Sequence, residues 1–116
     1  EASERRSKAL SLIKDVDDLT LAQIQAELKD IPDRKEFLDL VTLWLRDVLM
    51  YKSTGNGKRL VFKNEEHAIE VYAKTRSFEA LNRATEAVFT ANSQLNSNVT
   101  PEVALELLIL KLKDRV

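Results

Sequence analysis

Hydrophobic residues recur at intervals of three and four along most of the chain, which is the spacing of one face of an α-helix. Within residues 1–16 they follow a polar start, at Ala9, Leu10, Ile13 and Val16, and predict a first amphipathic helix. In residues 21–31 they begin after Thr20, a good helix N-cap, and end at Pro32, which a helix interior does not accept. No segment alternates apolar and polar residues over the length of a strand. The pattern predicts an all-α fold, a compact bundle of about six helices.

The longest predicted helix covers residues 33–54 and carries apolar residues on several sides. Such a helix is expected to run through the middle of the fold and to contact several neighbours. Arg46 and Asp47 interrupt the apolar arc. They either mark a solvent-facing gap or make a specific polar contact with a neighbouring helix or subunit. The apolar positions form two adjacent stripes: Phe37, Val41, Trp44 and Val48, and beside them Leu38, Leu45 and Leu49.

Both glycines of the chain lie in the stretch STGNGKR, the clearest loop signal in the sequence. The pair Gly57-Lys58 invites comparison with a phosphate-binding loop. That motif requires Gly where Lys52 stands and Ser or Thr where Arg59 stands, so the match fails. The apolar residues that follow, 60–62, are too few for an independent strand. The stretch therefore predicts a flexible connection.

Three further helices are predicted after this loop. Asn64 is the expected N-cap of the first, with acidic residues in its first turn, and Ser77 is a partial cap for the second, over residues 78–95. Thr100 is the expected cap of the last helix. Pro101 then occupies its first turn, where a missing N–H costs nothing.

The last helix, within the stretch NSNVTPEVALELLILKL, is apolar on nearly every side and holds one acid, Glu106, in its midst. A helix of this kind is not expected on a domain surface. Either the other helices of the domain cover both this helix and the long one at residues 33–54, or partner subunits cover part of them. If Glu106 is buried, it must be paired, because an isolated buried carboxylate is too costly to persist.

Composition limits the remaining choices. A chain of 116 residues that is 44% hydrophobic and 32% charged is expected to form one domain, residues 1–116, with a real core. Its net charge of -1 provides no overall attraction for nucleic acid or for an anionic membrane. The absence of cysteine excludes disulfides and thiol chemistry and is compatible with the cytoplasm. No apolar run is long enough to span a membrane.

The sequence offers little catalytic chemistry. His67 is the only histidine, and it has no second histidine or any cysteine with which to bind a transition metal. Neighbouring carboxylates point apart on a helix, and no nucleophile elbow, dinucleotide-binding turn or calcium loop is present. We therefore expect no catalytic, cofactor or metal site. A small hydrolase would have to depend on His67.

A free-standing helical module that binds nucleic acid is a second class of function. Acidic residues stand close to its candidate basic residues, and no recognition-helix or RNA-binding pattern accompanies them. The basic residues are Arg5, Arg6, Lys8, Lys58 and Arg59.

Two stretches of the sequence, FLDLVTLWLRDVLMYK and NSNVTPEVALELLILKL, carry a resemblance to a known family. Taken together they resemble the C-terminal domain of the delta-prime subunit of the bacterial DNA polymerase III clamp loader. The likeness covers essentially the whole chain, and it rests on the combination and order of the matching residues. These are Trp44, Leu45, Arg46, Asp47, Asn98, Val99, Pro101, Ala104, Leu105, Glu106, Leu107 and Leu108.

The resemblance implies a non-catalytic collar domain. In that family, this domain joins those of other subunits, delta and gamma or tau, in a pentameric collar that supports loading of the sliding clamp in the cytoplasm. An ATPase-like module in front supplies the contacts with nucleotide, clamp and primed DNA. The full-length family protein belongs to a DNA polymerase holoenzyme, which is a nucleotidyltransferase. A chain that starts at Glu1 rather than Met fits a fragment without that module. The collar domains of gamma or tau and of delta are the alternatives within the family.

The same resemblance suggests which polar and aromatic side chains have a structural or assembly role. We expect fixed contacts, either within the domain or across the collar, for Trp44, Arg46, Asp47, Asn98 and Glu106.

Overall fold

The computed structural model describes residues 2–116, so Glu1, on which the expectation of a fragment rested, lies outside it. Six α-helices and two single-turn 3-10 helices follow one another, and no strand occurs among residues 2–116. The prediction of an all-α bundle of about six helices is confirmed. The α-helices are α1 (Ala2–Lys14), α2 (Leu21–Lys29), α3 (Arg34–Thr54), α4 (Glu66–Thr75), α5 (Phe78–Leu95) and α6 (Pro101–Leu112), and the 3-10 turns are η1 (Val16–Asp18) and η2 (Lys63–Glu65).

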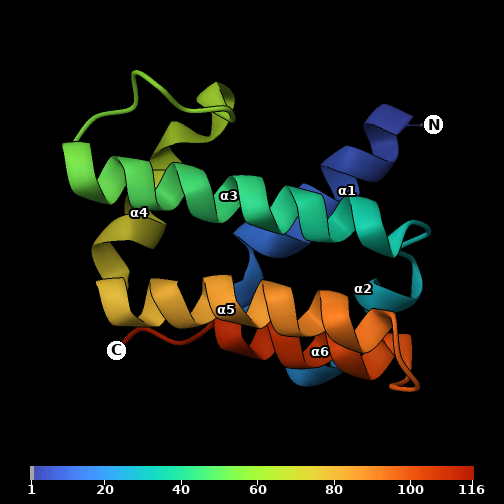
Figure 1. Ribbon diagram of the computed structural model, residues 1–116. Helices are drawn as coiled ribbons and strands as arrows, with labels where there is room; N and C mark the ends of the chain where they lie inside the picture. The colour runs from blue at the N-terminus through green and yellow to red at the C-terminus, as the bar shows by residue number, and fades with distance from the viewer. Residues whose placement is uncertain (1) are drawn as a thin grey trace.

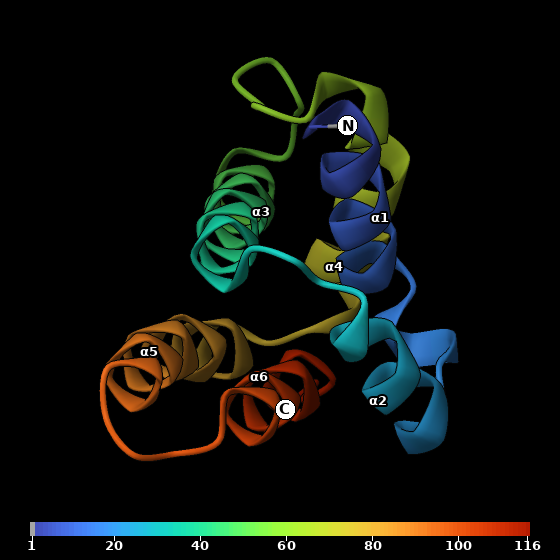
Figure 2. The same cartoon turned by 90° about the vertical axis from the view of Figure 1, so that its right-hand side faces the viewer.

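The helices form two layers (Figure 1). Figure 2 looks along α3, α5 and α6 and shows α3 beside α1 and α4 in one layer, with α5, α6 and α2 in the other. α5 packs against both α3 and α6 and runs antiparallel to each of them, while α2 packs against α6. α5 therefore joins the two layers along one side of the molecule.

The core lies between these layers. Trp44, Phe37 and Val41 of α3 are buried, as the stripe at residues 37–48 predicts. Most of the apolar surface of α6 is also covered by the domain itself. A narrower outward stripe on α6 stays between 39% and 48% exposed: Val103, Leu107 and Leu110.

Helix ends agree with the local sequence in four places. Thr20 forms a full capping box, in which its side chain accepts from the N–H of Gln23 while the Gln23 side chain accepts from the N–H of Thr20. The side chains of Asp33 and Ser77 cap α3 and α5 by accepting from the backbone N–H of Glu36 and of Ala80, without a reciprocal bond. Gly55 ends α3 in a left-handed conformation with φ of 75°, which a residue without Cβ adopts at little cost.

Two predicted caps differ in the structure. Asn64 does not cap a helix, because the Glu65 N–H donates to Phe62 O at 3.0 Å and winds residues 63–65 into η2. α4 therefore begins later, at Glu66, without a side-chain cap. Thr100 stands at the N-cap of α6, but its side chain makes no capping hydrogen bond.

Candidate functional site

The Arg46-Asp47 pair fixes the loop that follows α3. Asp47 is fully buried, and its carboxylate accepts from the backbone N–H of Val61 at 3.0 Å and of Phe62 at 2.8 Å. Arg46 is exposed at its tip, and its Nη1 donates to Asp47 at 2.9 Å and to Arg59 O at 3.3 Å. The break in the apolar arc is thus a polar contact with a later part of the same chain.

Trp44 lies in the core and not on a contact surface. Its ring is fully buried, with its centroid 5.3 Å from the Tyr72 ring in an edge-on arrangement and 6.1 Å from the Phe62 ring. The indole Nε1 is buried and has no hydrogen-bond partner among residues 2–116. The packing of this ring joins α3 to α4 and to the end of the loop.

Glu106 lies in the middle of α6, and Asn98 lies in the turn before that helix. Glu106 is half-buried and accepts from Gln25 Nε2 of α2 at 3.0 Å. One turn earlier on α6, Glu102 pairs with Arg34 at 3.1 Å. Asn98 is exposed in the turn before α6. Glu106 is therefore bonded within the domain, whereas Asn98 is open to solvent.

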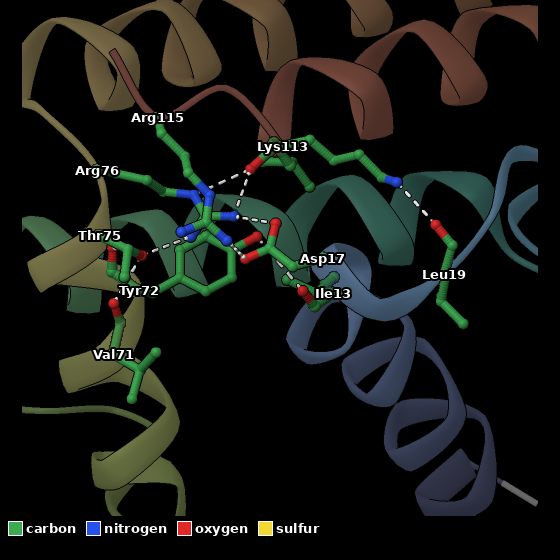
Figure 3. A network of polar contacts seen from close by, with 10 residues as sticks. Ile13, Asp17, Leu19, Val71, Tyr72, Thr75, Arg76, Lys113 and Arg115 are labelled. Carbon is green, nitrogen blue, oxygen red and sulfur yellow. Dashed lines mark hydrogen bonds and ion pairs between the residues drawn. The ribbon is translucent and has the colours of Figure 1, made fainter.

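A second polar cluster, which the sequence did not reveal, joins the end of α4 to η1 and to the carboxyl end of α6 (Figure 3). Arg76 is 3% exposed. Its Nη2 donates to Asp17 at 2.8 Å and to Leu112 O at 2.9 Å, and its Nε donates to Leu112 O at 3.1 Å. Arg115 also pairs with Asp17, at 3.1 Å. The guanidinium of Arg76 thus closes the carboxyl end of α6 and holds η1.

The Arg76 guanidinium also stacks on the Tyr72 ring, 3.6 Å from its centroid. Burial raises the pKa of the Tyr72 phenol well above its ordinary value, and the nearby Arg76 charge only partly opposes this. Nothing in the local sequence signals Arg76, because its partners Asp17 and Leu112 lie 59 and 36 positions away.

Apolar surface flanks α5 on both sides. A surface groove of about 480 Å³ lies between α5 and α3, and Phe89 at its rim is 73% exposed. A second groove, of about 580 Å³, lies between α5 and α6 beside Leu107 and Leu110. The first groove is lined by Thr42, Leu45, Arg46, Leu49, Met50, Ser53, Thr85, Val88 and Phe89.

The profile of one protein family, described as "DNA polymerase III, delta subunit, C terminal", matches residues 2–114. The chain belongs to this family. The clamp-loader family inferred from the two sequence stretches is thereby confirmed. The family is described by the delta subunit, so the assignment to delta-prime stays a prediction. Searches of curated proteins and of solved structures gave no match.

Two of the basic residues that could have formed a nucleic-acid patch on this delta-family domain, Arg5 and Lys8, face acids instead. Arg5 lies 3.9 Å from Glu36, and Lys8 pairs with Asp30 at 3.2 Å. In the loop after α3, Gly57 lies against the Glu66 carboxylate, which would repel a phosphate. The geometry therefore does not gather these cations on one surface free of carboxylates.

His67, on which a small hydrolase would depend, lies at the surface of α4. The His67 side chain is 90% exposed, and Nδ1 lies 4.0 Å from Glu70. Within residues 2–116, no three His, Asp or Glu side chains converge in a way that could hold a metal. No helix of that part of the chain combines the length and apolarity that crossing a membrane requires.

Proposed function

We propose that this domain is the collar domain of a DNA polymerase III clamp-loader subunit and that it acts by binding the helical domains of neighbouring subunits. It performs no reaction itself. It holds its subunit in the pentameric collar that supports loading of the sliding clamp. Family membership supports the role in assembly, and the exposed apolar surface on α5 is the place where we expect the contact.

The observation that carries this proposal is Phe89. A phenylalanine that is 73% exposed gains nothing for the fold of the isolated domain, and it stands at the rim of an apolar groove. Aromatic side chains next to apolar grooves are typical anchors of protein interfaces. On the far side of α5, the half-exposed stripe of α6 adds a second apolar surface, at Leu107 and Leu110. A domain with an apolar surface on two sides of one helix suits a ring, in which each subunit contacts two neighbours.

The occupant we assign to the groove between α3 and α5 is an amphipathic helix from the neighbouring subunit's domain. The groove contains one charged side chain, Arg46, and no acid. The Arg46 Nη1 donates to Asp47 and to Arg59 O, and the Arg46 side chain also lines the groove. A partner helix with apolar residues next to a carboxylate would fit both features.

The subunit is the finer part of the proposal. The tryptophan-containing WLRD helix and the closing NSNVTPEVALELL segment favour delta-prime, whereas the family description names delta. The two assignments predict different competition. A delta-prime domain added in excess displaces the delta-prime subunit from a clamp loader, and a delta domain displaces delta.

Co-elution tests the assembly role. The chain is mixed with delta, delta-prime and gamma or tau subunits from the same source and separated by size-exclusion chromatography. We expect it to elute with at least one of them. If circular dichroism shows a folded helical chain that elutes alone in every mixture, the proposed function is wrong.

A further inference from the structure

The loop after α3 exposes an Asn-Gly pair, Asn56-Gly57. α3 ends at Gly55 in its left-handed conformation, and Asn56 follows with its backbone held by one hydroxyl. The Asn56 N–H donates to Thr54 Oγ1 at 3.4 Å, while the Thr54 hydroxyl donates to Met50 O at 2.8 Å, within the last turn of α3. The Asn56 backbone is thus tied to the end of α3 but lies outside the helix.

The Asn56 side chain folds back along the chain. Its Oδ1 accepts from the Lys58 N–H at 3.0 Å, the arrangement of an Asx turn. This bond places the Asn56 carboxamide beside the backbone of the next two residues. No acceptor among residues 2–116 holds the Gly57 N–H, and Gly57 has no Cβ to hinder the approach.

We propose that Asn56 is a site of spontaneous deamidation and isoaspartate formation. The Gly57 nitrogen loses its proton to hydroxide or water and forms a bond to Asn56 Cγ. The bond from Cγ to Nδ2 breaks, and ammonia leaves with a proton, which gives a five-membered succinimide. Water then opens either of the two ring C–N bonds and yields aspartate or isoaspartate. No electrons are exchanged with any other group, and water is the co-reactant.

The other asparagines provide an internal comparison. Asn82 and Asn92 lie within α5, where the helical backbone keeps the next nitrogen in the hydrogen-bond ladder and away from the side chain. The remaining three precede residues with side chains, which crowd the attacking nitrogen. These pairs are Asn64-Glu65, Asn96-Ser97 and Asn98-Val99.

The modification would change the charge of the loop next to α4. A Cβ added at Gly57 would lie 2.5 Å from the Glu66 carboxyl carbon, so the loop already packs against one carboxylate. A new carboxylate one residue earlier repels it. The net charge of the chain becomes more negative by one, from -1 to -2, because one neutral amide is replaced. The bonds from Asp47 to residues 61 and 62 limit the effect to the first half of the loop.

Peptide mass spectrometry tests this proposal. The folded chain is incubated at mildly alkaline pH and digested with trypsin, which releases residues 53–58 with Asn56 as the only asparagine. We expect this peptide to gain about one dalton and to accept a methyl group from protein-isoaspartate methyltransferase. The peptides that carry the other five asparagines should change severalfold more slowly.

Two controls separate this route from its alternatives. In Gly57→Ala, the new Cβ meets only the flexible end of Glu66, so the variant should fold, and its conversion should slow severalfold. Equal conversion in that variant would overturn attack by the Gly57 nitrogen. A free peptide of residues 53–58 gives the rate without the fold. If the peptide converts while the folded chain does not, the structure protects Asn56 and the proposal is wrong.

Discussion

The carboxylate of Asp47 accepts a hydrogen bond from the backbone N–H of Phe62 at 2.8 Å, although the residues are 15 positions apart. It also accepts from the Val61 N–H. One buried side chain thus satisfies two backbone donors that lie outside any helix. The long connection between α3 and α4 is thereby closed onto α3. Phe62 is held beside Trp44, with the two ring centroids 6.1 Å apart.

Asp47→Ala should destabilise the domain strongly. The substitution leaves the N–H groups of Val61 and Phe62 without their acceptor and removes the carboxylate that pairs with Arg46. Such losses cost about 3 kcal/mol in the free energy of unfolding. Urea denaturation followed by Trp44 fluorescence measures this change. Hydrogen exchange at residues 61 and 62 should also accelerate.

Asp39→Ala is the matched control, since Asp39 is an exposed acid on the same helix. We expect its effect to lie within about 0.5 kcal/mol. Equal losses for the two variants would mean that Asp47 contributes nothing beyond surface charge.

Arg76→Met should also lower stability, by about 3 kcal/mol, because it removes a buried guanidinium from its ion pair with Asp17 and leaves Leu112 O without its two donated bonds. The comparison is Arg34→Met, which removes an ion pair with Glu102 whose side chains are 43% and 48% exposed. Solvent screens that pair, so its loss should cost less than about 1 kcal/mol. Thermal unfolding of both variants measures the two losses. Equal losses would mean that Arg76 contributes no more than a solvent-exposed ion pair.

The two caps predicted with Thr provide a further contrast. Thr20→Ala removes the capping box of α2 and should cost about 1 kcal/mol. Thr100→Ala removes a side chain that makes no capping bond, so we expect a change within about 0.5 kcal/mol. Chemical denaturation resolves the difference. A loss at Thr100 as large as that at Thr20 would contradict the capping geometry of α6.

High pH should destabilise the domain through Tyr72. Burial raises the pKa of its phenol in the folded state above the ordinary value of 10.0. As the pH rises, the unfolded state therefore loses the phenol proton of Tyr72 before the folded state does. The resulting stability is complete below pH 10.0 and is lost as the pH rises above it.

Tyr72→Phe isolates this effect. The hydroxyl donates only a long bond, 3.4 Å, to Ile13 O, so the variant should lose less than about 1 kcal/mol near neutral pH. Its stability should then fall less steeply than that of the parent chain in alkali. Parallel curves for the two proteins above pH 10.0 would show that Tyr72 ionises without penalty.

The sequence predicted the helices well, because apolar spacing and capping residues are local signals. It also marked residues 46 and 47 as an interruption, but it could not name their partners, since these depend on how the loop returns to α3. Arg76 was missed for the same reason, with partners on η1 and α6. The surplus of apolar residues on α6 suggested partner contacts, whereas α5 and α2 cover most of it, and the most exposed aromatic side chain is Phe89 on α5.

Phe89→Asp should separate association from folding. Because the ring is 73% exposed, its removal should change the free energy of unfolding by no more than about 0.5 kcal/mol. Removal of an interface anchor should weaken binding to the neighbouring subunit by about tenfold or more, which corresponds to about 1.4 kcal/mol. Val71→Asp is the control, because Val71 is 46% exposed on α4, away from both grooves. Titration calorimetry with the subunit that co-elutes measures both affinities. If the parent chain binds and Phe89→Asp binds equally well, the domain still assembles but the groove between α3 and α5 is not the contact. A chain that binds no clamp-loader subunit at all would instead contradict the assembly role itself.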